Sequence, residues 1–117
     1  MGLLVKKLKA GYGQDFNNIY FKVDRVNYFP KQNILSYCGF FYLNKEVADQ
    51  GYEALPGIGL YDACECTDKT SNFYEVAYNA IKQKAKEATN VDDFIQHGEH
   101  HPDYVANYNI FKDAQDI

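Results

Sequence analysis

Three histidines stand close together in the segment His97–His101, which also contains one glutamate. Histidine beside a carboxylate is common zinc-ligand chemistry. A helix would bring His97 and His101 onto one face, but Gly98 and Pro102 both oppose a helix there. The order of residues also differs from the His-Glu-x-x-His pattern of a metalloprotease helix. We interpret the segment as an exposed polar loop. A metal site, with a cysteine as an added ligand, is the alternative.

The three cysteines are Cys38, Cys64 and Cys66. An odd number does not form a closed disulfide framework, and one intervening residue is too few for a Cys-x-x-Cys redox or zinc motif. Buried free thiols behave as small apolar side chains. We therefore expect all three cysteines to be reduced and structural, which suits a reducing compartment.

The remaining polar motifs carry little chemistry. The adjacent carboxylates at Asp92-Asp93 and in the segment 113–116 are interpreted as solvated charges or helix caps, because acid–base work needs carboxylates in unequal environments. A Gly-x-Ser-x-Gly nucleophile elbow is absent. Gly11-Tyr12-Gly13 and Gly57-Ile58-Gly59 do not continue into a phosphate loop and predict turns. We assign no catalytic, cofactor-binding or metal-binding residue.

The composition narrows the class of protein. Aromatic residues make up 16% of the 117 residues, which is too many for a disordered chain. The formal net charge of -4 opposes nucleic-acid binding, and the short basic stretch 82–86 suits a helix C-terminus instead. The sequence shows neither a secretory signal nor an apolar run long enough to span a bilayer. We expect a soluble single domain, residues 1–117, made in the cytoplasm.

Tyrosine is the strongest remaining signal. The chain has 11 tyrosines, and burying every one of them would require a hydrogen-bond partner for each hydroxyl. Some tyrosines should therefore lie partly exposed, and tyrosine is enriched at binding surfaces. We expect function to reside in a contact surface that carries tyrosine.

Four segments show the pattern of β-strands. In the second, Ile19, Phe21 and Val23 alternate with polar residues, and the alternation slips near Arg25, which predicts a bulge or a strand end. The third is aromatic on both faces, which indicates a central strand, and Gly39 would let a neighbouring ring lie close. The residues 29–33 between these two predict a turn. The four expected strands are Leu3–Ala10, Asn18–Tyr28, Ile34–Leu43 and Ile58–Cys66.

Helical spacing appears mainly after residue 70. Apolar residues recur at three- and four-residue intervals from Asn72 to Ala88, with Ser71 as the expected N-cap. A short helix over 45–50 would begin after Asn44 and end at Gly51. Another short helix is expected over 91–96, and the tail from 102 to 117 has no clear period.

These elements predict an α+β fold that is mainly β. We expect a β-sandwich-like antiparallel sheet with one main helix, about 72–88, packed on one side. The expected core consists of Ile19, Phe21, Val23, Leu35, Tyr37, Phe41, Leu60, Phe73, Val76, Ala77 and Ile81.

Five short motifs follow one another along the chain: Tyr12-Gly13, Asn18–Val26, Tyr42–Glu46, Asn72–Tyr74 with Ala77-Tyr78, and Phe111–Ile117. Their order resembles that of small proteins encoded by phages and prophages of Gram-positive bacteria, such as Bacillus siphophages, between their tail and lysis genes. The resemblance covers most of the chain and departs between 88 and 109, where this sequence carries an apparent insertion with the histidines.

The resemblance implies a non-enzymatic accessory or structural protein of a phage, in the tail, baseplate or an assembly step. Its partners would be phage structural proteins or a component of the host surface, and it would be made in the host cytoplasm and carried in the virion. Two alternatives stay open: a module that binds cell-wall carbohydrate, and a small metal-dependent enzyme that uses the histidines. A homo-oligomer also stays open.

Overall fold

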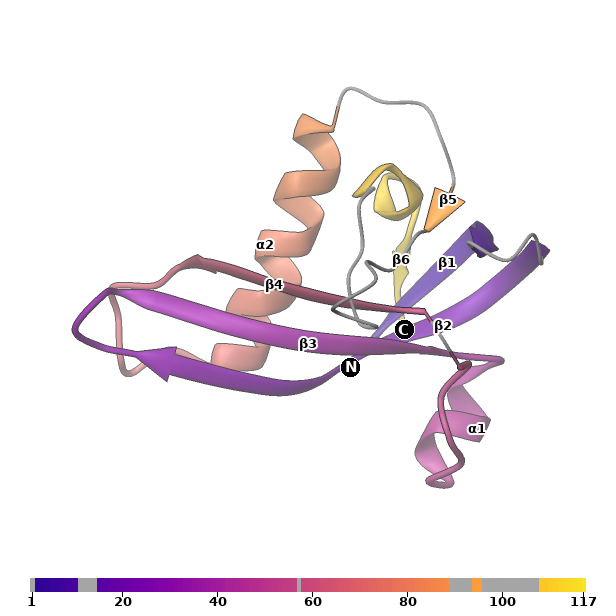
Figure 1. The fold of residues 1–117 in the computed structure, drawn as a ribbon, viewed down its shortest axis with the longest axis horizontal. Coiled ribbons are helices and arrows are strands. Elements are labelled where there is room, and N and C mark those ends of the chain that lie inside the picture. Colours follow the sequence, from indigo (N-terminus) through magenta and orange to yellow (C-terminus); the bar gives the residue numbers. More distant parts are fainter. Residues whose placement is uncertain (1, 11–14, 57, 89–93, 96–107) are drawn as a thin grey trace.

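The computed structural model describes residues 2–10, 15–56, 58–88, 94–95 and 108–117 (Figure 1). Its described strands form one six-stranded sheet in the order β4-β3-β2-β1-β5, with β6 pairing with β1. The strands are β1 (Leu3–Ala10), β2 (Asp15–Phe29), β3 (Ile34–Tyr42), β4 (Gly59–Glu65), β5 (Phe94–Ile95) and β6 (Gln115–Asp116). The helices are α1 (Lys45–Asp49), α2 (Phe73–Glu87) and the 3₁₀ helix η1 (Tyr108–Phe111).

The expected α+β, mainly β fold is confirmed. All strand pairs are antiparallel except β1 with β5. The expected sandwich-like arrangement takes the form of one sheet covered by helices, because all the described strands belong to a single sheet. Helix α2 and η1 form the layer opposite the sheet, while α1 lies on its other side (Figure 1). We call these two sides the inner face and the outer face. None of the described helices is long and apolar enough to cross a membrane.

Local irregularities in β2 and β3 lie where the sequence predicts them. The register between the two strands shifts between Val23 and Arg25, which confirms the expected bulge. Val26 and Tyr28 therefore pack on the inner face together with Val23. A turn over 30–33 joins the strands, with the N–H of Gln32 donating to the carbonyl of Phe29 at 3.2 Å. This hairpin supplies the long central strands on which the rest of the molecule packs.

The helices confirm two expectations and correct two others. Asn44 caps α1 with its side chain, and Gly51 follows that helix at a φ of 81°. Helix α2 covers the predicted span, but its N-cap is Asn72, not Ser71, because the Asn72 carboxamide accepts from the N–H of Tyr74 and of Glu75. The helix expected over 91–96 is wrong at Phe94–Ile95, which pairs as a strand with β1. The other residues of that prediction lie outside the described ones.

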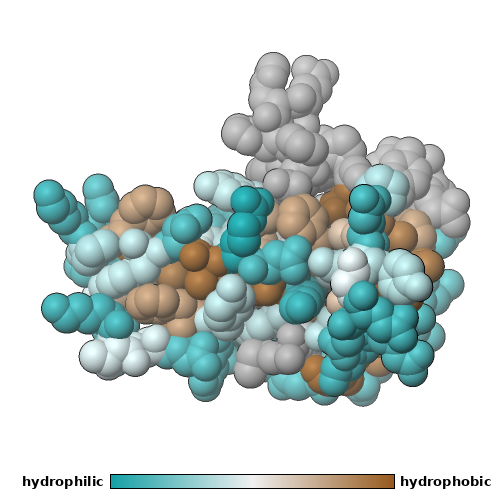
Figure 2. Space-filling model, turned by 90° about the horizontal axis from the view of Figure 1, so that it is seen from below, coloured by the Kyte–Doolittle hydropathy of each residue, from teal (hydrophilic) through white to brown (hydrophobic). Residues whose placement is uncertain are grey.

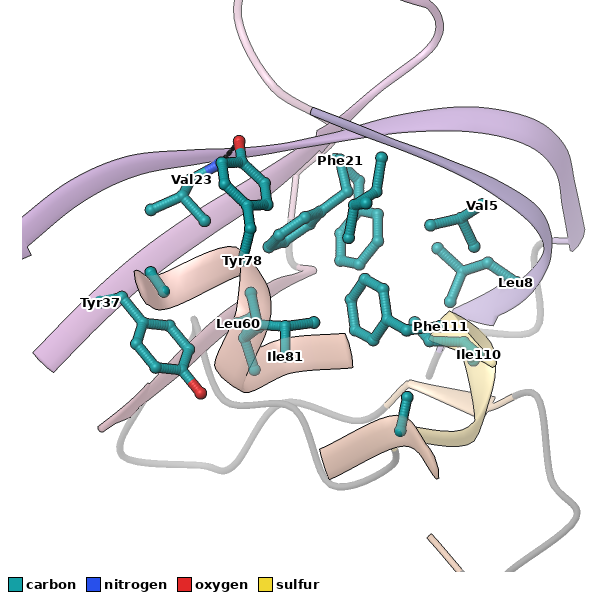
Figure 3. Packing of buried hydrophobic residues seen from close by; sticks show 14 of the residues in the cluster. Val5, Leu8, Phe21, Val23, Tyr37, Leu60, Tyr78, Ile81, Ile110 and Phe111 are labelled. Carbon is teal, nitrogen blue, oxygen red and sulfur yellow. Dashed lines mark hydrogen bonds between the residues drawn. The ribbon is translucent and has the colours of Figure 1, made fainter. Parts of the chain in front are cut away.

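The core lies between the inner face and the helical layer (Figure 3). All the expected core residues are buried except Phe73 and Val76, which are partly buried and pack against the core. The sequence did not indicate the role of the tail. The Phe111 ring stands 5.0 Å from the Phe21 ring and 6.1 Å from the Phe41 ring, measured between centroids. The other residues of this core that were missed include Leu3, Val5, Leu8, Ile58, Tyr78, Ala85 and Ile110.

Candidate functional site

The outer face is covered only in part. Helix α1 shields the buried side chains of Tyr20 and Tyr42, which form a small second cluster with Ala48. The Tyr42 hydroxyl donates to Asp24 Oδ2 at 3.2 Å. Burial, followed by the charge of Asp24, raises the pKa of Tyr42 to about 12, so this phenol stays neutral at physiological pH. The cluster therefore fixes α1 to the sheet.

Beyond α1 the outer face exposes large apolar side chains, which we call the outer patch. It consists of Phe29, Ile34 and Tyr61, which are 47%, 39% and 54% exposed. Phe29 is opposite Ile34 across β2 and β3, and Tyr61 on β4 is opposite Cys38 on β3. Figure 2 shows this side of the molecule, with hydrophobic residues in brown between hydrophilic residues in teal. The outer patch is the strongest candidate for a contact surface on the described residues.

A polar cluster lies at the opposite side of the sheet, where β3, β4, α2 and η1 meet. The Tyr108 hydroxyl donates to Asp62 Oδ2 at 2.5 Å, and Lys84 Nζ donates to the same oxygen at 2.9 Å. The hydroxyls of Tyr37 and Tyr108 are 3.1 Å apart. Lys84 also lies 5.7 and 5.5 Å from the centroids of the two tyrosine rings, which are cation–π distances.

The pKa of each group in this cluster is shifted in the direction that favours the group's ordinary protonation state at neutral pH. Burial raises the pKa of Asp62, but the hydrogen bonds from Tyr108, Lys84 and the Ala63 N–H outweigh burial and lower it overall. Burial lowers the pKa of Lys84, and its bond to Asp62 reverses this and raises it overall. Burial is also the main cause that raises the pKa values of Tyr37 and Tyr108.

These directions decide what the cluster can do chemically. A carboxylate with a lowered pKa is a weak base, and a phenol with a raised pKa is a weak acid near neutral pH. At that pH the cluster consists of one fixed ion pair and two neutral phenols. Its clearest role is to fasten four elements together, since Tyr37 lies on β3, Asp62 on β4, Lys84 on α2 and Tyr108 on η1.

The residues singled out in the sequence have different outcomes. The histidine segment 97–101, Asp92-Asp93 and residues 11–13 lie outside the described residues, as does Gly57. Within the described ranges, no group of three or more His, Cys, Asp or Glu side chains could hold a metal ion. All three cysteines are free; Cys38 and Cys66 are buried and Cys64 is partly buried. Burial raises the pKa of the Cys64 thiol.

The tyrosine prediction also has a mixed outcome. Tyr52, Tyr61 and Tyr74 are exposed, as expected of some tyrosines. The Tyr74 hydroxyl, however, donates to the carbonyl of Asp24 at 3.2 Å and is therefore part of the fold. Tyr61 is the exposed tyrosine that lies in the outer patch.

The polar cluster was missed by sequence reasoning, although the sequence contained a signal. Asp62 lies two residues from both Leu60 and Cys64 on β4, and side chains at this spacing share one face of a strand. Its carboxylate therefore lies on the inner face. Lys84 follows Ile81 by three residues and so lies beside the apolar stripe of its helix. A charge on the buried side of each element requires a partner, and these two charges are partners of each other.

The comparisons with known proteins add no assignment. No family model, no curated protein and no solved structure matches this chain.

Proposed function

We propose that this protein works without catalysis, as an accessory or structural protein of a phage that contacts another protein through the outer patch. The observation that carries the proposal is the exposure of Phe29, Ile34 and Tyr61 together on one half of the outer face. Apolar surface that gathers on one side of a monomeric protein often marks an interaction site. Aromatic residues such as Phe29 and Tyr61 are also enriched at the centres of protein interfaces.

The phage context is supported by the motif order in the sequence, and the partner proposed is a structural protein of the tail or baseplate. The polar cluster supports a contact role in an indirect way. Its four groups keep fixed protonation states near neutral pH, so this cluster of ionisable side chains serves packing. The exposed apolar residues are then the surface feature that the fold itself does not use.

The test is binding to the isolated structural proteins of a phage that encodes this chain, measured one by one by surface plasmon resonance. Ile34→Lys places a charge in the outer patch, directly opposite Phe29. It also places that charge opposite Glu65 in the register, so cross-strand repulsion is avoided. We expect the variant to bind at least tenfold more weakly, about 1.4 kcal/mol.

Leu43→Lys is the matched control, because Leu43 is 56% exposed but lies beyond the other end of β3. This variant should bind as the wild type does. Equal affinity for wild type and Ile34→Lys, or no binding to any structural protein, would refute the proposed contact. Mass spectrometry of purified virions then shows whether the chain is carried in the particle.

A carbohydrate-binding role is the second candidate, because the exposed rings of Tyr52 and Tyr61 could stack on sugars. Pelleting with purified cell walls distinguishes the two candidates. A carbohydrate-binding module would be enriched with the walls and would lose that enrichment in a Tyr61→Ser variant. Absence of enrichment would remove this candidate.

A further inference from the structure

Strand β4 forms one edge of the described sheet, and side chains bond the outward backbone groups of its residue Ala63. In an antiparallel pair, successive residues alternately bond to the partner strand and point away from it. At Ala63 the N–H donates to Asp62 Oδ1 at 2.8 Å, and the carbonyl accepts from Lys84 Nζ at 2.8 Å. Lys84 is itself bonded to Asp62 at 2.9 Å. We call Asp62 and Lys84 the edge clasp.

A second edge is closed in the same manner on β2. The pairing of β1 with β2 ends at Leu3 and Phe21, so the following part of β2 has no described strand on that side. Just past this point the N–H of Val23 donates to the Tyr78 hydroxyl at 2.8 Å (Figure 3). The carbonyl of Asp24 accepts from the Tyr74 hydroxyl at 3.2 Å.

Three of the side chains that bond these backbone groups, those of Tyr74, Tyr78 and Lys84, lie on one helix, α2. Tyr74 and Tyr78 lie in the first half of α2 and reach β2, whereas Lys84 lies near its end and reaches β4. The helix therefore crosses the inner face from the unpaired part of β2 to β4. At each edge it supplies a polar side chain to a backbone group that an incoming strand would need.

We infer that helix α2 closes β4 and the unpaired part of β2 to strand addition, and that the edge clasp keeps the β4 edge from pairing with a second copy of this chain. Unprotected edge strands associate with one another through their unpaired backbone groups. Without the clasp, the outward N–H and carbonyl of Ala63 match those of Ala63 in a second copy about a two-fold axis. This inference does not depend on the proposed function, because the edge clasp and the outer patch consist of different residues.

The first test needs only the wild-type protein, by amide hydrogen exchange monitored with NMR. Tyr61, Ala63 and Glu65 share the outward direction on β4, but only Ala63 has clasp bonds among those that the structure shows. We expect the Ala63 amide to exchange at least tenfold more slowly than the amides of Tyr61 and Glu65. Equal rates at the three positions would overturn the inference.

The second test removes the clasp with the double variant Asp62→Ala/Lys84→Met. Light scattering over a concentration series should show dimers or larger species in this variant that the wild type does not form. The control Glu65→Ala/Lys86→Met removes the same kinds of charge from exposed positions of the same two elements, and it should behave as the wild type.

Circular dichroism establishes that the double variant is folded before its mass is interpreted. A folded double variant that stays as monomeric as the wild type would overturn the inference, as would association of the control to the same degree. If the double variant fails to fold, Asp62→Ala alone provides the decision, since it should abolish the slow exchange of the Ala63 amide. Retention of slow exchange in that variant would refute the clasp.

Discussion

Gly39 shows how closely the core constrains single residues. A Cβ at this position would collide with the Phe21 ring and would stand 2.9 Å from the Lys22 carbonyl oxygen. The sequence predicted that this glycine admits a ring from a neighbouring strand, and the structure confirms it. What the sequence could not supply is the identity of the ring, because that depends on the register between β2 and β3.

We expect Gly39→Ala to lower the free energy of unfolding by about 2 to 3 kcal/mol, since overpacking moves both a buried ring and a backbone strand. Urea denaturation followed by fluorescence measures this loss. Gly59→Ala is the comparison, because its nearest contacts, at 3.2 Å, include a side chain that can move. A smaller loss for Gly39→Ala than for Gly59→Ala would contradict the argument.

The lowered pKa of Asp62 predicts how the stability of the protein depends on pH. Its pKa is lowered in the folded state, so its contribution is present above the unfolded value of about 3.9 and is lost as pH falls through the folded pKa. The Asp62 side chain is 40% exposed, so solvent screens its ion pair. We expect Asp62→Asn to cost about 1 kcal/mol at pH 7.

The measurement is the free energy of unfolding of wild type and Asp62→Asn between pH 3 and pH 8. The difference between the two proteins should be constant from about pH 6 upward and should shrink below about pH 4. A difference that grows as the solution becomes acidic would show that the carboxylate is not stabilised by its partners.

At the scale of elements, the long strands were predictable because alternation extends over many residues. The expected Leu3–Ala10 is β1 without change, and β2 and β3 differ from expectation by a few residues at their ends. Short elements escaped, because a two-residue strand such as β6 or a single 3₁₀ turn such as η1 has no period to detect. These elements form through contacts with residues distant in sequence.

The start of α2 offers a direct test of the corrected cap. Ser71 and Asn72 are both residue types that cap helices, so sequence alone does not separate them. The structure gives the two capping bonds to the Asn72 side chain. We expect Asn72→Ala to destabilise the protein by about 1 kcal/mol in thermal or urea unfolding, and Ser71→Ala to leave it within about 0.3 kcal/mol. The reverse order would restore the original assignment.

For the whole molecule, composition and patterning were enough to predict an α+β fold with a mainly antiparallel sheet. The positions of Asp62 and Lys84 beside apolar residues gave a signal, but the sequence does not show that they meet Tyr37 and Tyr108, because the four residues lie on four separate elements. For the outer patch, the sequence predicted only that a contact surface carries tyrosine, and it did not identify the residues. Which tyrosine lies there depends on how α1 and α2 divide the two faces of the sheet.

The C-terminal segment closes the core, and Phe111 is its anchor. The ring is buried and packs against the Phe21 and Phe41 rings, which belong to the two central strands. Phe111→Ala should lower the free energy of unfolding by about 3 to 4 kcal/mol. Chemical denaturation measures this change, and Lys112→Ala, at an exposed neighbouring position, should have almost no effect. Equal effects would show that the segment does not complete the core.

The two ends of the described chain also bond to each other. Gly2 and Ile117 exchange reciprocal backbone hydrogen bonds, each 3.1 Å long. The described chain therefore begins and ends at the same place, beside β1, and its backbone path is nearly a closed ring. A short peptide ligating the ends would complete this ring without moving any strand, and the cyclised polypeptide would have fewer unfolded conformations to regain. The same geometry allows circular permutation, with fresh termini cut into a surface turn.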